Sequence, residues 1–181
     1  KKTYTVTYNA NGGTGAPANQ TKTHGVDLTL SSTKPTRDGY DFVSWNTKSD
    51  CSGTTYKSGA KYTANANLTL YAQWSKKTYT VTYNANGGSG APSAQTKTHG
   101  VDLTLSSTKP TRDGYNFVSW NTKSDGKGTT YQPSAKYTTN ANLTLYAQWS
   151  KKTYTVVYNA NGGSGAPASQ TKTYGVDLTL A

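Results

Sequence analysis

The sequence lacks most of the groups from which catalytic and metal sites are built. Glutamate and methionine are absent, and the 181 residues include only eight acidic residues, two histidines and one cysteine. Acid–base and nucleophilic catalysis need converging groups of these types, and a calcium cage needs several carboxylates. We therefore expect no enzymatic activity, no catalytic residues, no metal site and no cofactor.

The few histidine and cysteine positions fit no reactive pattern. His24 and His99 occupy equivalent places in two near-identical stretches, but Tyr174 stands at the third. A histidine that tyrosine replaces does not fit a general base or metal ligand, so we interpret this position as an exposed strand residue. Cys51 cannot form an internal disulfide, and its counterpart is Gly126. A neutral replacement in a turn is the simplest interpretation, and an intermolecular bridge or reactive thiol stays open.

Long apolar runs are also missing. None approaches the roughly 18 residues of a membrane-spanning helix, so we expect no membrane span. Apolar residues make up only 32% of the chain, but 15 tyrosines and 4 tryptophans fall in short alternating runs. Disordered chains are poor in aromatics, and this pattern therefore indicates folded β structure.

The charge is one-sided but evenly spread. The net charge is +11, and no cluster of basic residues stands apart from the rest. Proteins that bind nucleic acid concentrate like charges in arms or patches, so we expect no nucleic-acid partner. An evenly basic surface indicates a solvated exterior, or a weak preference for anionic surfaces such as cell-wall polymers or acidic glycans.

The feature that is present is repetition. Residues 1–75 and 76–150 align without gaps and differ at only 10 positions, and residues 151–181 begin a third copy. We predict two repeat modules with these boundaries, followed by the first two strands of a third. The linkers between copies are short, so the expected arrangement is an elongated array of beads on a string.

Within one copy, residues alternate with period two. Residues 3–8, 40–45 and 68–74 predict strands, and residues 20–30 predict another, bent at Gly25, with Val26, Leu28 and Leu30 on one face. The polar segment 46–67 predicts at most a short strand or a helical turn. The fold class is therefore mainly β, with little or no helix.

Two segments carry a family resemblance. Residues 35–45 read PTRDGYDFVSW, residues 68–74 read LTLYAQW, and both patterns recur 75 residues later. At this spacing they resemble the Listeria–Bacteroides repeat, the internalin B-repeat type, although Ser44 stands where that family usually has glycine. The resemblance implies a small β-grasp-like fold in tandem copies on secreted or wall-anchored bacterial proteins, with no catalytic residues to carry over.

These observations lead to a functional hypothesis. We expect an extracellular stalk or spacer and interaction region of a bacterial surface adhesin-like protein, with neighbouring repeats as its first partners. The alternative is a module that binds glycan or cell-wall polymer, or a host protein, through exposed aromatics and lysines, although no contact residue is indicated. Aromatic residues should form the cores and junctions: Tyr8, Phe42, Trp45, Trp74, Phe117, Trp120 and Trp149. Trp74, beside the linker, is the candidate for packing between repeats.

Overall fold

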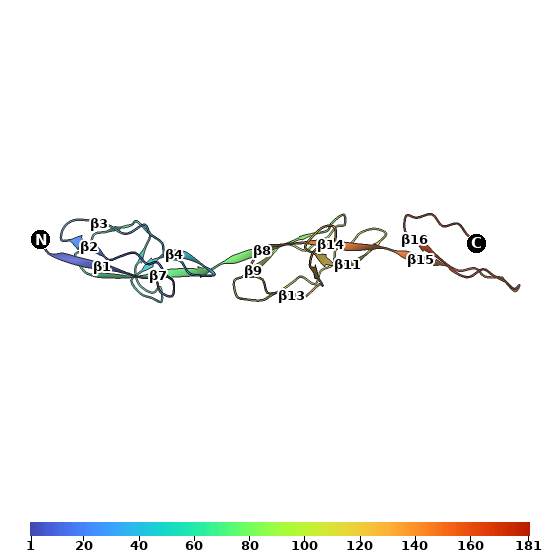
Figure 1. The fold of residues 1–181 in the computed structure, drawn as a ribbon, viewed down its shortest axis with the longest axis horizontal. Helices are drawn as coiled ribbons and strands as arrows, with labels where there is room; N and C mark the ends of the chain where they lie inside the picture. The colour runs from blue at the N-terminus through green and yellow to red at the C-terminus, as the bar shows by residue number, and fades with distance from the viewer. The chain divides into compact units, whose positions relative to one another are not determined.

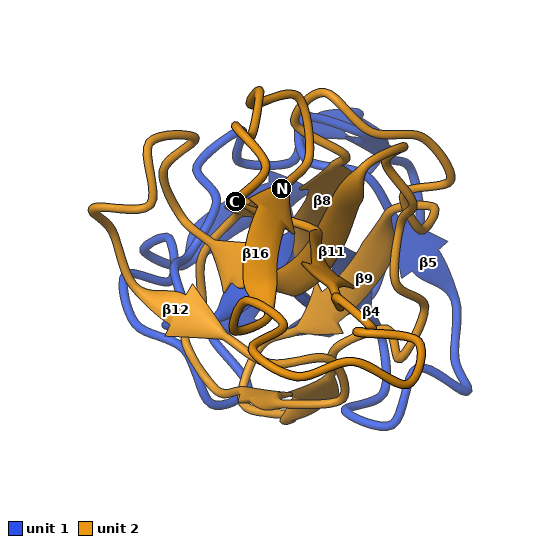
Figure 2. Ribbon diagram, turned by 90° about the vertical axis from the view of Figure 1, so that its right-hand side faces the viewer, with its two compact units in different colours: residues 1–78 blue, residues 79–181 orange.

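A computed structural model describes residues 1–181 as strands, turns and loops without a helix (Figure 1). No helix is therefore present that could cross a membrane. The chain divides into two compact units, residues 1–78 and 79–181 (Figure 2). The expected mainly β fold is confirmed.

The first unit holds a five-stranded sheet and a smaller two-stranded sheet. The large sheet has the order β2-β1-β7-β4-β5, and β3 pairs with β6. The strands are β1 (Thr3–Asn9), β2 (Gln20–Thr23), β3 (Leu28–Thr29), β4 (Tyr40–Asn46), β5 (Thr55–Tyr56), β6 (Lys61–Tyr62) and β7 (Leu68–Lys76).

The first and last strands of the unit are parallel neighbours at the centre of the sheet. β1 pairs with β7 in parallel, with Val6 opposite Leu68 and Asn9 opposite Tyr71. β2 and β4 flank this pair in antiparallel directions. This strand order agrees with the β-grasp-like arrangement that the resemblance implies, although here no helix covers the sheet.

Alternation along the central strands builds the core. Val6, Leu70 and Trp45 are fully buried, and Tyr8 is 6% exposed. Leu30 and Tyr62, which lie next to and within the small β3–β6 sheet, close the core from the other side. Burial of large side chains of this kind is the main favourable term in folding, about 1.5–3 kcal/mol for each aliphatic or Phe side chain.

A bulge in β4 explains how its aromatics reach one core. The register against β7 shifts between Phe42 and Ser44, and Val43 is 59% exposed at that point. The extra residue turns Phe42 and Trp45 toward each other, and their ring centroids lie 5.2 Å apart. Strict alternation would have placed these two rings on opposite faces. Ser44, where the family usually has glycine, is buried at the bulge.

The predicted strand at residues 20–30 is wrong in its middle part. β2 ends at Thr23, and the chain turns through Gly25 with φ of 73° while the amide of Val26 donates to the carbonyl of Thr23. This turn leaves Val26 49% exposed rather than on the core face. Leu28 and Leu30 do pack against the core. The cause is a tight turn that the glycine permits and that a bent strand would not contain.

The second unit repeats this topology and adds two strands. Its large sheet has the order β12-β11-β14-β8-β9, β10 pairs with β13, and β15 pairs with β16. The strands are β8 (Thr78–Asn84), β9 (Gln95–Thr98), β10 (Leu103–Thr104), β11 (Tyr115–Asn121), β12 (Thr130–Tyr131), β13 (Lys136–Tyr137), β14 (Leu143–Lys151), β15 (Thr153–Val156) and β16 (Gln170–Thr173).

Candidate functional site

The most informative site in the second unit is the point where one repeat passes into the next. β14 ends at Lys151 and β15 begins at Thr153, so a single residue, Lys152, connects them (Figure 1). The amide of Lys152 donates to the carbonyl of Gly114, and the carbonyl of Lys152 accepts from the amide of Tyr174, each at 2.9 Å. The connection is therefore held from both sides by backbone hydrogen bonds.

Tyr174 docks on the turn that precedes β11. Its hydroxyl donates to a carboxylate oxygen of Asp113 at 2.9 Å, and its ring lies edge-on to Tyr115 with 6.0 Å between centroids. A Cβ built on Gly114 would fall 2.0 Å from the nearest ring carbon. The hydrogen bond to Asp113, followed by its negative charge, raises the pKa of Tyr174. Tyr174 thus fills the space that the missing side chain of Gly114 leaves.

Local sequence explains why the turn has this shape. The amide of Tyr115 donates to the carbonyl of Arg112 at 3.1 Å, and Gly114 adopts φ of 71° between them. The guanidinium of Arg112 lies over the Tyr115 ring, with its central carbon 4.0 Å from the centroid. The other side of this guanidinium approaches Gly87 of the glycine-rich loop. The Asp-Gly pair therefore forms the tight turn expected of it.

The sequence interpretation missed the role of Tyr174. It placed residues 24, 99 and 174 on an exposed strand, whereas Tyr174 follows the end of β16 and is half-buried against the preceding repeat. The departure from histidine at this position was the only available signal. Its partner Asp113 lies 61 residues away in the sequence, and no local pattern points to it. His24, by contrast, is exposed and shares a hydrogen bond with the Tyr4 hydroxyl.

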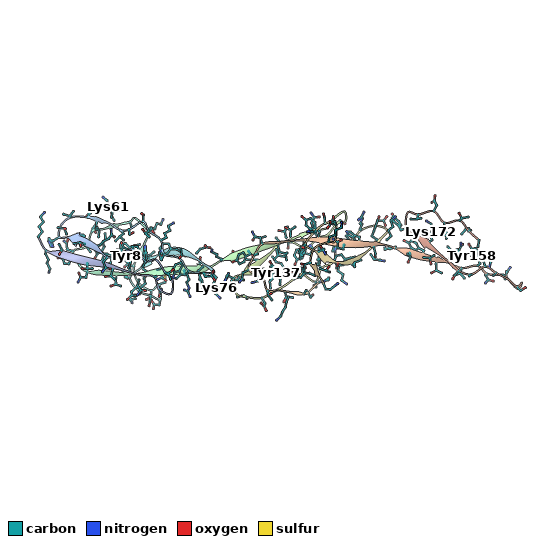
Figure 3. The ribbon with its side chains drawn as sticks, in the orientation of Figure 1. Tyr8, Lys61, Lys76, Tyr137, Tyr158 and Lys172 are labelled. Carbon is teal, nitrogen blue, oxygen red and sulfur yellow. The ribbon has the colours of Figure 1, made fainter.

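The aromatics singled out from the sequence lie in or around the two cores. Tyr8, Trp45 and Trp120 are buried, and the remaining four are partly buried against the cores: Phe42, Trp74, Phe117 and Trp149. Tyr8, labelled in Figure 3, belongs to the core of the first unit, where its hydroxyl bonds the side chain of Gln20 and burial raises its pKa.

Trp74, the tryptophan proposed for packing between repeats, and its counterpart Trp149 each bond within their own repeat. The indole N–H of Trp149 donates to the carbonyls of Ala85 and Asn86 at 3.0 and 3.1 Å. Its ring also lies against Gly88, where a Cβ would come within 2.5 Å of a ring carbon. Trp149 therefore anchors the glycine-rich loop, and Tyr174 makes the junction contact. Trp74 bonds Ala10 and Asn11 in the same way.

Buried polar side chains tie the loops to the sheet, and no pattern in the sequence indicates them. Asn121 is fully buried, donates to Gly126, Gly128 and Thr130, and accepts from the amides of Lys123 and Gly128. Such fully satisfied groups fix one loop conformation.

The second buried polar group is a lysine. Lys97 is also fully buried, and its ammonium donates to the Thr98 carbonyl and to Asn140 Oδ1 at 2.9 Å. The amide of Gly100 donates to the same oxygen of Asn140. In the partial repeat the matching Lys172 (Figure 3) bonds only backbone carbonyls, those of Thr173 and Val176. The lysine and asparagine pair therefore belongs to the complete repeats.

Cys51 lies in an exposed turn with φ of 66°, and Gly126 has φ of 76° at the equivalent place. Glycine adopts this left-handed conformation without the steric cost that a side chain adds. The backbone thus accounts for the exchange between the two copies. No group of three or more His, Cys, Asp or Glu residues is placed to hold a metal ion.

Comparison with known proteins points to one repeat family. The family model of the Listeria-Bacteroides repeat domain matches residues 4–73, 79–148 and 154–181. A putative Gly-rich membrane protein and a putative membrane protein of Evansella cellulosilytica are each 33% identical, over 79% and 81% of this chain. Internalin H of Listeria monocytogenes is 30% identical over 84% of the chain.

These relatives are much longer than the chain. The matched region spans 16% and 22% of the two Evansella proteins and 26% of internalin H. No solved structure matches the chain.

Proposed function

The chain belongs to the Listeria-Bacteroides repeat family, and from this premise we propose that it is a load-carrying spacer in a bacterial surface protein. The single observation that carries the proposal is the parallel pairing of the first and last strands of each complete repeat. The spacer holds another part of the longer protein at a distance from the cell.

The parallel pair resists tension because of where the chain enters and leaves it. In the second unit Val81 of β8 lies opposite Leu143 of β14, and Asn84 lies opposite Tyr146. The start of β8 and the end of β14 are therefore at opposite ends of the pair. Tension between them slides the strands along each other, so that the hydrogen bonds across the pair must fail together. A pair loaded from one end would instead open one bond at a time.

The junction supports the transfer of tension between repeats. Lys152 alone connects β14 with β15, and Tyr174 docks beside it on Asp113. A one-residue connection with these contacts leaves little slack, because flexible linkers need several residues to reorient. Tension that leaves one repeat thus passes directly into the first strand of the next.

The relatives support the location and the class of protein. One is called an internalin and two are called putative membrane proteins, which fits a place at the bacterial cell surface. We propose an extracellular, adhesin-like parent protein with a structural rather than catalytic repeat region. Neighbouring repeats are the partners that this role requires.

Single-molecule pulling tests the spacer role with two attachment geometries in the second unit. Cysteines at Thr80 and Ser150, both exposed, load β8 and β14 in opposite directions along the pair. Cysteines at Thr80 and Ala141 load the same two strands from one end. Both variants also carry Cys51→Gly, which matches the residue of the second copy. The pulling handles then react only with the two introduced cysteines.

The spacer role requires a several-fold higher unfolding force for the Thr80–Ser150 geometry than for the Thr80–Ala141 geometry. Equal forces in the two geometries would contradict the proposal, because the parallel pair would then give no mechanical advantage. Chemical unfolding of both variants serves as the control, since it shows whether the cysteines themselves weaken the fold.

A further inference from the structure

Each unit contains an open pocket beside the turn that precedes β4 in the first unit and β11 in the second. In the second unit the pocket has a volume of about 370 Å³ and lies between the turn before β11, β11 itself and the end of β14. The matching pocket of the first unit has about 350 Å³. The spacer role makes no use of either pocket.

Positive charge gathers at the pocket of the second unit. Lys109, Arg112 and Lys152 line it, and no aspartate does. Lys109 is exposed, so its ammonium is free to reach a ligand, and Arg112 is held in place over the Tyr115 ring. A guanidinium that is already ordered loses little entropy when it pairs with a carboxylate, and it offers two parallel N–H groups.

The remaining wall of the pocket is aromatic. Phe117 and Trp149 both line it, and each is partly exposed. Their rings meet edge to face with 5.9 Å between centroids. Ligand sites commonly combine an apolar wall with a few charged groups that fix orientation. A sugar ring with an acidic substituent fits both features, because its C–H face packs on the rings while its acid meets the cations.

One substitution between the two copies distinguishes their pockets. Asn116 lines the pocket of the second unit, and Asp41 stands in its place in the first. The two pockets otherwise share the same residue types. Asp41 adds a negative charge that repels an anionic ligand, and the two units thus form a natural pair that differs in one charge.

A second pocket in each unit, beside the turn that follows β4 or β11, does not share this character. In the second unit it is lined by Thr122, Lys123, Ser124, Asp125 and Tyr146. Its single lysine is offset by an aspartate, so charge does not select an anion there.

We propose that the pocket formed by Lys109, Arg112, Lys152, Asn116, Phe117 and Trp149 binds an anionic saccharide, and that the first unit binds the same ligand more weakly because of Asp41. The ligand is an acidic unit of a polysaccharide such as a uronic acid. This gives a location to the alternative function that the sequence left open. It goes beyond the spacer role and does not depend on it.

The test uses the full chain and a short oligogalacturonate as the probe. Calorimetry measures the affinity, and amide NMR shifts of residues 109–117 and 34–42 separate the two pockets. We expect the second pocket to saturate at lower probe concentration. Asn116→Asp should weaken it about fivefold, and Asp41→Asn should strengthen the first pocket by a similar factor, as expected for one added or removed charge near an exposed anion. Lys109→Gln should weaken the second pocket to a similar extent.

Matched controls change the same charge elsewhere in the second unit. Gln132→Glu and Lys127→Gln alter exposed positions outside the pocket, and they should leave the affinity within about twofold. A neutral maltooligosaccharide should fail to bind, and polyphosphate should bind more weakly than the uronate because it offers no ring for the aromatic wall.

Three results would overturn the proposal. Equal effects of pocket and control variants would show diffuse attraction by net charge rather than a site. Equal binding of the neutral sugar would remove the role of the cations. Polyphosphate binding as well as the uronate would remove the role of the sugar. None of these results would alter the unfolding forces that test the spacer role.

Discussion

Tyr174 of the partial repeat donates its hydroxyl to Asp113 of the preceding repeat at 2.9 Å. This contact joins the last segment of the second unit to the turn before β11, next to the one-residue connection at Lys152. Because the same turn also accepts the amide of Lys152 through Gly114, side chain and backbone hold the junction together.

Removal of the Tyr174 side chain should loosen the junction without unfolding the repeat. Tyr174→Ala loses both the hydrogen bond and the ring contact with Tyr115, and Tyr174→Phe loses only the hydrogen bond. We expect the amide of residue 174 to exchange about tenfold faster in the alanine variant, as expected for a loss of about 1–2 kcal/mol. Hydrogen exchange measures this effect.

The control for this prediction is Val157→Ala, which shortens a side chain that is 74% exposed and lies just beyond the end of β15. It should leave the exchange of residue 174 unchanged. Unaltered exchange in Tyr174→Ala itself would show that the ring does not hold the junction.

A methyl group at Gly114 should displace the Tyr174 ring from the turn before β11. Gly114→Ala would place a Cβ within 2.0 Å of the Tyr174 ring, and Gly114 has φ of 71°. Gly100 has φ of 70° and open space around its Cβ position, so Gly100→Ala reports the backbone cost alone, about 1 kcal/mol. Tryptophan fluorescence during urea unfolding measures stability, and hydrogen exchange measures docking.

We expect both alanine variants to lose similar stability, and only Gly114→Ala to lose protection at residue 174. Loss of protection in both would attribute the effect to backbone strain in general rather than to the contact with the ring.

The buried asparagine of β11 should tolerate no charge. Asn121→Asp removes the two amide N–H donors that Gly126, Gly128 and Thr130 share, and it places a carboxylate toward the carbonyls of Gly126 and Gly128. We expect the second unit to lose about 3 kcal/mol of unfolding free energy at neutral pH. Urea unfolding measures this loss. The exposed Asn116→Asp undergoes the same chemical change and should shift stability by less than about 0.5 kcal/mol.

Alkaline pH should weaken both units through their buried tyrosines. Burial raises the pKa of Tyr8 and Tyr83 in the folded state. The folded state therefore favours the neutral phenol, and the stability that this provides is complete below the unfolded pKa of about 10 and is lost as pH rises through the higher folded pKa. Unfolding free energies measured between about pH 8 and 11 should fall.

Tyr83→Phe should reduce the fall of unfolding free energy at alkaline pH by up to about 1.4 kcal/mol per pH unit. The reason is that it removes one ionisable group that binds its proton more tightly in the folded state than in the unfolded state. An unchanged slope in this variant would show that the Tyr83 phenol does not contribute. Val157→Ala changes an exposed side chain without removing a phenol; it is the control and should leave the slope as it is.

The sequence predicted the sheet well and the junction poorly, for physical reasons. Alternation in β1 and β7 determines which side chains face inward, and Val6 and Leu70, which lie on those faces, are fully buried. The bulge at Val43 breaks that alternation, and the turn at Gly25 interrupts an apparent strand.

The contacts that hold the loops and the junction join residues that are far apart in the chain. Asn140 lies 43 residues from Lys97, and Asp113 lies 61 residues from Tyr174. Such pairs form only once the sheet has brought their segments together, and no pattern of period two contains them. The pocket cations are hidden in the sequence for the same reason, since Lys109 lies near the middle of the second copy and Lys152 lies at the start of the third.

The most direct test of the spacer account is nuclear relaxation of backbone amides across the second unit. If the junction is held as described, β15 and β16 tumble with β8 and β14 and share one rotational correlation time. A distinctly shorter correlation time for β15 and β16, with the Tyr174 amide unprotected, would contradict the account, because a freely pivoting connection cannot pass tension or spacing from one repeat to the next.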